Sequence, residues 1–199
     1  MISTKKFQGL VAGFIAVLIT LLLLSCNNPF KTRKPEEPDE LGGKALKPAT
    51  SPENVLYNLR VSFENMSIQD YLDIYSEDFV FNPDPDDSIK YEEDFRYGWG
   101  FEKEQVFAEN FLQRIVTSEI QVYPNYVYKP GQDMYEYNYS IFVFPADSIK
   151  TETIKVKGTA WIYLKENEEK KWEVYKWVEM ENMIEGSYIT WGVLRVLNI

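Results

Sequence analysis

Residues 134–144 read MYEYNYSIFVF, and this stretch decides the fold. Every second residue is aromatic or aliphatic, and such alternation places apolar side chains on one face of a β-strand. The pattern therefore predicts a long strand with one buried face. That face carries Tyr135, Tyr137, Tyr139, Ile141 and Val143.

The same alternation continues on both sides of this strand. Ile120 and Val122 alternate with polar residues before it, and residues 154–164 read IKVKGTAWIYL after it. A polar loop over 167–170 leads into a further strand pattern over 172–180. Consecutive strands joined by short polar loops form an antiparallel meander.

Helical signals precede the strands. Residues 51–54, Ser-Pro-Glu-Asn, offer a helix cap, a proline at the first helical position and an acid in the first turn. Phe107, Phe111 and Ile115 recur every fourth residue further on, which predicts a buried helix face. The predicted elements are, in order, a helix over 52–65, a short helix that starts at Ser67 and ends before Asp78, a strand over 79–81, a loop over 82–94, and a helix over 101–116.

These elements predict an α+β fold. The helices come first and the meander follows, so a curved antiparallel sheet wraps the helices to bury its apolar face. The chain has 199 residues, 45% hydrophobic and 16% aromatic, which is enough for one sizeable core. Residues 52–199 contain all of the Trp and Tyr residues and are expected to form this domain.

Charge and the rare residue types exclude several classes of function. The chain carries 31 Asp and Glu residues against 21 Lys and Arg residues, a formal net charge of -10, so nucleic acid is not expected as a partner. It has no His and a single Cys. Zinc sites built from Cys and His, Ser-His-Asp triads, Cys-His dyads and internal disulfides are therefore excluded. No cofactor and no metal is expected.

The first 25 residues have the layout of a secretory signal. Lys5 and Lys6 precede an apolar run over residues 10–24, and the small residue Ser25 follows it. The run is shorter than the roughly 20 residues that a membrane-spanning helix needs. We expect residues 1–25 to be a signal peptide, with a permanent transmembrane anchor as the alternative.

Residues 23–26, Leu-Leu-Ser-Cys, end at the only cysteine of the chain. They resemble the lipobox of bacterial lipoproteins. The resemblance implies that the Cys26 thiol receives a diacylglyceryl group, that the leader is removed, and that acyl chains on Cys26 hold the protein at membrane lipid. The expected location is the bacterial cell envelope, with the domain outside the cytoplasm. A chance cysteine in a membrane segment is the alternative.

Residues 26–51 are expected to be the lipidated cysteine and a disordered linker. Their composition shifts to Pro, Lys, Glu, Gly and Thr, which bury too little apolar surface to offset the entropy of ordering. Such a segment remains extended at about 3.1 Å per residue in its Pro-rich parts.

Several short patterns in residues 52–199 follow the order of the predicted elements. They are Pro52-Glu53-Asn54-Val55-Leu56 with Asn58 and Leu59, Tyr71-Leu72 leading to Asp78-Phe79-Val80-Phe81, Trp99-Gly100, and Trp172, Val174 and Trp177. This arrangement resembles the nuclear transport factor 2-like superfamily, which includes polyketide-cyclase-like and ketosteroid-isomerase-like domains. The resemblance implies a cone of N-terminal helices packed on a curved antiparallel sheet, with a pocket between the first helix and the concave face.

Catalytic members of that superfamily use an Asp base with a Tyr donor, or an Asp-His pair, and the lack of His excludes the second. A buried carboxyl group with a raised pKa beside a Tyr hydroxyl would work as a proton shuttle. None of the candidates matches a catalytic motif, and core or rim positions are the alternative. The candidates are the acids Asp70, Asp73 and Asp78 and the tyrosines Tyr57, Tyr71, Tyr163 and Tyr175.

Trp161, Tyr163, Tyr175 and Trp177 occupy alternate positions on two neighbouring predicted strands, so we expect them on one face. Together with Tyr57 they are the candidate lining of a pocket for a small apolar ligand. Packing beneath helices is the alternative interpretation.

Three acids, Asp84, Asp86 and Asp87, invite comparison with a calcium-binding loop. An EF-hand loop that starts at Asp84 needs Gly and Glu where this chain has Ile89 and Phe95. A solvated acidic loop is therefore expected rather than a metal site.

Three functions remain open. The first is a membrane-anchored lipoprotein whose non-catalytic cone domain binds a small apolar ligand or an envelope protein. The second is an isomerase- or cyclase-like enzyme with a Tyr/Asp pocket, and the third is a structural module of an envelope assembly. A carboxylate within hydrogen-bond reach of a Tyr in a pocket favours the enzyme, a wide apolar cavity favours the binder, and a filled cone favours the structural module.

Overall fold

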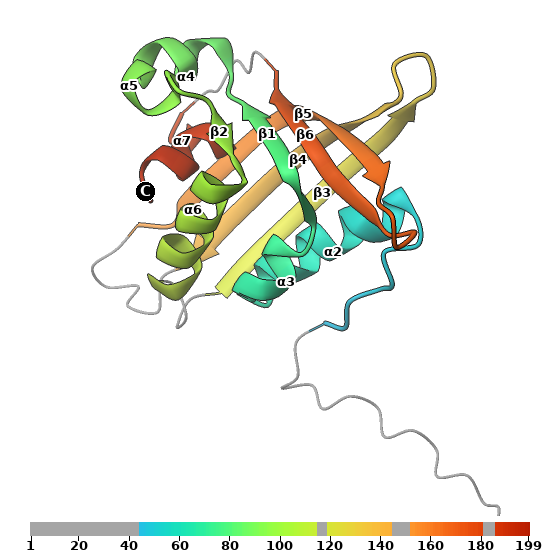
Figure 1. The fold of residues 1–199 in the computed structure, drawn as a ribbon. Helices are drawn as coiled ribbons and strands as arrows, with labels where there is room; N and C mark the ends of the chain where they lie inside the picture. Colours follow the sequence, from blue (N-terminus) through green and yellow to red (C-terminus); the bar gives the residue numbers. More distant parts are fainter. Residues whose placement is uncertain (1–43, 115–118, 145–151, 181–185) are drawn as a thin grey trace, which may run out of the picture. The chain divides into compact units, whose positions relative to one another are not determined.

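The long strands predicted from the alternating stretches are neighbours in the computed structural model (Figure 1). They form an antiparallel meander, and the predicted inner face of the second strand, from Tyr135 to Val143, is buried. The strands are β3 (Glu119–Lys129), β4 (Met134–Phe144), β5 (Ile154–Glu166) and β6 (Trp172–Glu179).

The structure describes residues 44–114, 119–144, 152–180 and 186–199. The expected signal peptide over 1–25, the lipidation site Cys26, the linker as far as residue 43, and Ile115 lie outside these ranges. Within them, no helix combines the length and the apolar character that crossing a membrane requires.

The sheet gains two strands on the side of β6. β1 (Tyr75–Asn82) pairs in parallel with β6, and β2 (Trp99–Gly100) pairs antiparallel with β1. The predicted α+β fold with a curved antiparallel sheet is therefore confirmed through the meander, and the parallel pairing of β1 with β6 is an addition that was not predicted. β1 is also longer than the predicted strand over 79–81. No hairpin joins β1 to β6, so the pattern along the chain did not determine their relative direction.

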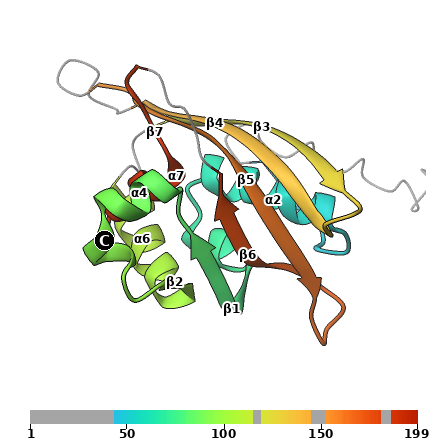
Figure 2. The same ribbon diagram turned by 90° about the horizontal axis from the view of Figure 1, so that it is seen from above.

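Helices cover one face of the curved sheet (Figure 2). Ser51 caps the first by accepting a hydrogen bond from the Asn54 N–H group, and Ser67 caps the second through the Asp70 N–H group, so both predicted starts are confirmed. The second helix ends earlier than predicted because residues from Tyr75 onward join β1. These helices are α2 (Pro52–Glu64), α3 (Ile68–Leu72) and α6 (Phe101–Arg114).

The prediction of a loop over 82–94 is wrong, because α4 (Pro85–Lys90) and α5 (Glu92–Phe95) lie there. The Asp84 carboxylate accepts a hydrogen bond from the Asp86 N–H group at 2.9 Å, and Pro85 stands at the first helical position. These are signals of a helix start rather than of a break. Asp84 is also buried rather than solvated.

Two C-terminal elements were not predicted. β7 (Tyr188–Ile189) pairs in parallel with β5, and α7 (Trp191–Val196) follows it. Thr190 caps α7, since its hydroxyl oxygen accepts a hydrogen bond from the Val193 N–H group at 2.9 Å. Trp191 and Arg195 are fully buried, so α7 belongs to the core.

The described domain begins at residue 44, before the predicted boundary at residue 52. Residues 44–50 lie along α2 as an extended segment, which we call the strap. Asparagine side chains of α2 bind its backbone, which composition alone did not reveal. The linker prediction is therefore corrected for the strap.

Candidate functional site

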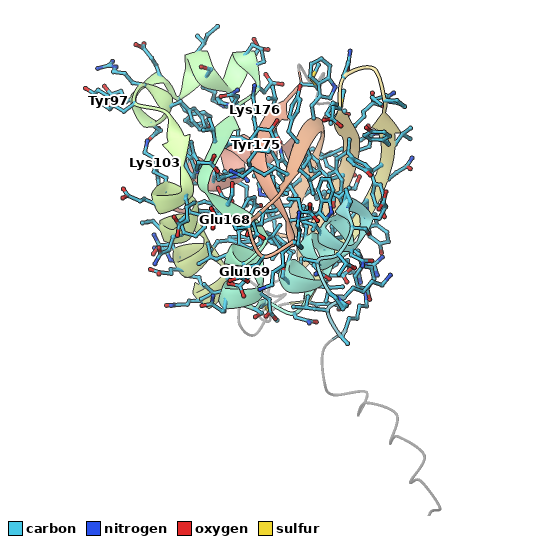
Figure 3. All side chains as sticks on the ribbon, turned by 45° about the vertical axis from the view of Figure 1, so that its right-hand side comes forward. Tyr97, Lys103, Glu168, Glu169, Tyr175 and Lys176 are labelled. Atoms are coloured by element: carbon cyan, nitrogen blue, oxygen red, sulfur yellow. The ribbon has the colours of Figure 1, made fainter. Side chains whose placement is uncertain are left out.

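The four aromatic residues predicted to share one face lie on two. Trp177 is fully buried on the inner face of β6. Trp161, Tyr163 and Tyr175 are half-buried. The rings of Tyr163 and Tyr175 lie 6.2 Å apart on the outer face, where Figure 3 labels Tyr175. The expected aromatic cluster is therefore divided by the sheet.

A β-bulge causes this division. The register of β5 and β6 shifts between Tyr163 and Leu164, so that one extra residue lies in β6. Val174 and Trp177 are both buried although three positions separate them. A bulge of this kind moves every following side chain to the opposite face.

The other predicted residues do not join the aromatic ones. Tyr57 is half-buried on α2, and Lys47 Nζ lies 4.1 Å from the centre of its ring. Asp78 is exposed, and its Oδ1 atom lies 2.6 Å from Lys165 Nζ. The hydrogen bond from Lys165 holds the pKa of Asp78 below its ordinary value, so this acid is unsuited to hold a proton at neutral pH.

A fully buried ion pair joins α6 to α7. Arg195 Nε lies 2.8 Å from Glu104 Oε2, and Arg195 Nη2 lies 3.0 Å from Glu104 Oε1. Glu104 also accepts hydrogen bonds from the Tyr71 hydroxyl group and, at 2.8 Å, from Trp99 Nε1–H. Burial and the charge of Glu104 raise the pKa of Tyr71 well above its ordinary value, so that Tyr71 remains a donor. The candidate Tyr71 is thus part of a structural network.

Aromatic rings surround the guanidinium group of Arg195. A guanidinium group stacks favourably on such rings, and burial strengthens the interaction. The ring centres lie 4.1 Å from the guanidinium carbon for Phe81, 5.1 Å for Trp177, 5.4 Å for Trp191 and 5.8 Å for Phe107.

Glu179, at the end of β6, is a second buried acid. The Tyr139 hydroxyl group donates a hydrogen bond to Glu179 Oε1 at 2.7 Å, and Trp177 Nε1–H donates to the same atom at 3.3 Å. Burial raises the pKa of Glu179 to about 7, although the bond from Tyr139 opposes this shift. Glu179 Oε2 has no hydrogen-bond partner among the described residues. This is a Tyr–carboxyl pair of the expected chemistry, made by residues other than the predicted ones.

The side chain of Trp191 occupies the space between the helices and the sheet. Its ring centre lies 4.7 Å from that of Trp177 and 5.3 Å from those of Tyr139 and Phe63. Its backbone N–H group donates a hydrogen bond to the Tyr139 oxygen at 3.1 Å. Trp191 therefore covers the Tyr139–Glu179 pair, and a ligand at this place would have to displace a fully buried tryptophan.

Asp87 of α4 binds the cap of α7. The Thr190 hydroxyl group donates a hydrogen bond to Asp87 Oδ2. Burial raises the pKa of Asp87 above its ordinary value, and the bond from Thr190 opposes this shift. The acidic segment, defined as Asp84, Asp86 and Asp87, thus contacts the start of α7 through Asp87. Among the described residues, no three His, Cys, Asp or Glu side chains are arranged to hold a metal ion.

Open space is found at the surface, in a groove of about 720 Å³ between the strap, α3, the start of α6 and the β5–β6 hairpin. A second hollow of about 450 Å³ lies beside the β3–β4 hairpin and includes Trp161. Neither contains Glu179 or Trp191. The lining of the groove includes Leu46, Ala49, Asn58, Asp70, Asp73, Phe101, Gln105, Glu169, Lys171, Trp172 and Glu173.

The groove carries net negative charge. Asp70, Asp73, Glu169 and Glu173 line it, together with the single base Lys171. Lys171 Nζ pairs with Glu169 Oε2 at 2.6 Å, so one basic side chain faces four acidic ones in the groove. Glu169 lies on the hairpin that comes forward in Figure 3. Acids beside the apolar rings of Phe101 and Trp172 suit a positively charged, partly apolar ligand.

The sequence patterns missed Glu104, Tyr139, Glu179 and Arg195 as site residues. A signal existed for two of them. Glu104 precedes Phe107 and Phe111 by three and seven residues, which is the spacing of one helix face. Glu179 follows Trp177 by two residues in a strand, which places both side chains on one face. A charged residue at a core position is unusual unless it is paired.

Comparisons with known proteins leave the chain without an assigned family. No protein-family model matches it, and no curated protein is similar in sequence. Similar solved structures include a ketosteroid isomerase-like protein from Erwinia carotovora atroseptica, with 14% identity and a TM-score of 0.42 over 64% of this chain and 91% of that chain. A domain of unknown function with a cystatin-like fold from Nostoc punctiforme shares 12% identity, with a TM-score of 0.43 over 65% and 74% of the two chains. AusH from Aspergillus nidulans shares 10% identity, with a TM-score of 0.48 over 68% and 88%. At such identities the similarity concerns the fold alone.

Proposed function

We propose that this chain is a lipid-anchored envelope protein whose folded part is a non-catalytic binding module, and that the surface groove binds a segment of another envelope protein. One observation carries the proposal: the groove of about 720 Å³ is open, whereas Trp191 fills the space beside Tyr139 and Glu179. A ligand can enter the groove without displacing a core side chain.

The lining of the groove favours a basic, partly apolar polypeptide over a small apolar molecule. Sites for small apolar ligands are enclosed and mostly apolar, whereas Asp70, Asp73 and Glu173 lie along this groove. The domain over 52–199 carries 27 acidic against 14 basic residues, so its field also attracts a basic partner before contact.

Photo-crosslinking in the native envelope tests the groove. Gln105 is an exposed residue of α6 that lines the groove, and Asn125 is an exposed residue of β3 that does not. A crosslinking amino acid at position 105 should give one discrete protein adduct, and the same amino acid at position 125 should give none. Equal adducts from both positions would contradict a groove-specific partner.

Charge reversal then tests the chemistry of the partner. Asp73→Lys changes an exposed acid of the groove, and we expect about a tenfold weaker adduct from position 105. Glu109→Lys makes the same change of charge on α6 outside the groove and should have little effect. If both variants weaken the adduct equally, net charge rather than the groove selects the partner.

The anchor rests on the residues at positions 23–26. Cys26→Ser should abolish the incorporation of radiolabelled palmitate and release the protein from the membrane fraction, because serine has no thiol to acylate. Ser25→Ala keeps the cysteine and a small residue before it, and should leave both unchanged. Labelled palmitate in Cys26→Ser would refute the anchor.

A second candidate function is acid–base catalysis by Tyr139 and Glu179. Their 2.7 Å hydrogen bond and the Glu179 pKa of about 7 favour it. It requires Trp191 to move aside, so ligand-observed NMR with a series of phenols should detect binding that Glu179→Gln weakens. Absence of binding by the wild-type chain would remove this candidate.

A further inference from the structure

The strap is held by two asparagine side chains of α2. Asn58 and Asn65 are seven residues apart, which is close to two helical turns and places them on one face. The Lys47 N–H group donates to Asn58 Oδ1 at 2.8 Å, and Asn58 Nδ2 donates to the Lys47 carbonyl oxygen at 2.7 Å. Asn65 makes the same pair of bonds with Lys44, at 3.0 and 2.8 Å.

These bonds recognise main chain rather than side chains. Each amide group supplies one donor and one acceptor to a single backbone residue, as a neighbouring strand does. A third asparagine, Asn54, donates from Nδ2 to the Pro48 carbonyl oxygen at 2.9 Å. The two-asparagine clamp, defined as Asn58 and Asn65, is therefore a binding site for extended polypeptide that the chain's own strap occupies.

The strap also reaches the sheet and the groove. The Trp172 N–H group at the start of β6 donates to the Ala49 carbonyl oxygen at 2.8 Å. Leu46 and Ala49 line the groove together with Asn58 and Trp172. One wall of the groove is therefore made by the segment that continues into the chain toward Cys26.

Docking of the strap is weakly favourable on physical grounds. Its side chains are mostly exposed, Leu46 by 39%, so little apolar surface is buried. Hydrogen bonds near water contribute a modest net free energy, and ordering the strap backbone costs entropy of similar size. Such segments belong to the least stable parts of a fold.

We infer that the strap is a releasable wall of the groove. When it is docked, the clamp fixes where the chain toward Cys26 leaves the domain and completes the groove. When it is released, the groove loses Leu46 and Ala49. The linker between Cys26 and the domain then gains the seven residues of the strap, or about 25 Å of reach. Docking involves only this chain, so it does not depend on the partner proposed above.

Hydrogen exchange of the full chain in detergent tests this inference. In the wild type, the amide groups of Lys44 and Lys47 should exchange at least about tenfold more slowly than in an unstructured peptide, and much faster than the core of β4. Lys47→Pro removes one clamped N–H group from the strap and leaves α2 intact. It should speed exchange of the Trp172 amide group about tenfold, because the strap detaches as a unit.

Two further variants separate docking from global stability. Asn65→Ala removes one half of the clamp and should speed the exchange of the Lys44 and Trp172 amide groups. Asn125→Ala changes an exposed asparagine of β3 and should leave the exchange of both groups unchanged. All variants should keep the exchange of β4 unchanged. Unprotected Lys44 and Lys47 in the wild type would overturn docking. Unchanged exchange of the Trp172 amide group in Lys47→Pro would contradict detachment of the strap as a unit. Protection of the strap equal to that of β4 would contradict its release from the folded domain.

Discussion

Arg195 and Glu104 lie 91 residues apart in the chain and form a two-point ion pair with both side chains fully buried. Removing two charges from water is costly, and only good geometry with further hydrogen bonds compensates. Here Trp99 and Tyr71 supply those bonds to Glu104, and aromatic rings surround Arg195. The pair therefore ties the docking of α7 to the position of Glu104 on α6.

Removing one partner should be severely destabilising. Arg195→Met leaves Glu104 charged and unpaired in the core, and we expect a loss of about 3 to 5 kcal/mol in the free energy of unfolding, measured by urea denaturation. Glu104→Met combined with Arg195→Met should cost less than the sum of the single changes. Arg96→Met breaks an exposed pair with Glu92 and should cost under about 1 kcal/mol. Equal effects of Arg195→Met and Arg96→Met would contradict a buried pair.

Glu179 should make stability decline as pH rises. Its pKa is raised from 4.5 to about 7 in the folded protein, so Glu179 binds a proton more tightly in the folded protein than in the unfolded chain. Its contribution is complete below about pH 4.5 and falls by on the order of 3 kcal/mol as pH passes through 7. The difference in unfolding free energy between the wild type and Glu179→Gln, measured from pH 4 to 8, should show this decline.

Glu53 provides the control of opposite sign. Its pKa is lowered, chiefly by the hydrogen bond that the Tyr135 hydroxyl group donates at 2.6 Å. Its stabilising contribution is therefore present above the ordinary value of 4.5 and is lost at lower pH. Glu53→Gln should thus be more costly at pH 7 than at pH 3. A wild-type minus Glu179→Gln difference that does not change with pH would contradict a buried, titrating Glu179.

The fold was predictable where burial follows the local period. From Tyr135 to Phe144 burial alternates along β4, and the five predicted inner-face residues are all buried, whereas the burial of Met134 was not predicted. The bulge in β6 has no such local signal, because it arises from pairing between Tyr163 and Lys176. It turns Trp177 to the inner face of the sheet and leaves Tyr175 on the outer face. The prediction that the four aromatic residues share one face was therefore wrong.

The site was less predictable because its residues meet only in three dimensions. Glu104 and Glu179 each stand at core spacing, so their burial could have been predicted from period alone. The partner Arg195 lies on α7, a helix of six residues that is too short for a clear apolar period. The strap was missed for another reason: its docking depends on Asn58 and Asn65, not on its own composition.

Trp191→Ala should open an interior cavity. Loss of a fully buried tryptophan that contacts Trp177 and Tyr139 should cost about 3 to 5 kcal/mol of unfolding free energy. Indole fits the vacated space, so it should raise the melting temperature of this variant in a concentration-dependent way and leave the wild type unchanged. Trp161→Ala, on the half-buried outer face, should cost less and show no response to indole. Indole stabilisation of the wild type would instead indicate that an interior pocket already exists.

Thr190 joins the cap of α7 to the acidic segment, and valine is its matched replacement in shape. Thr190→Val removes the acceptor for the Val193 N–H group and the donor to Asp87 Oδ2, and should lower the unfolding free energy by about 2 kcal/mol. The bond from Thr190 lowers the raised pKa of Asp87, so its loss raises that pKa further, and the cost should grow as pH rises above the ordinary Asp value of 3.8. Thr190→Ser keeps the hydroxyl group and should retain most of the stability at every pH. A Thr190→Val cost that is the same at pH 4 and pH 8 would mean that Thr190 acts only as a helix cap and that Asp87 does not depend on it.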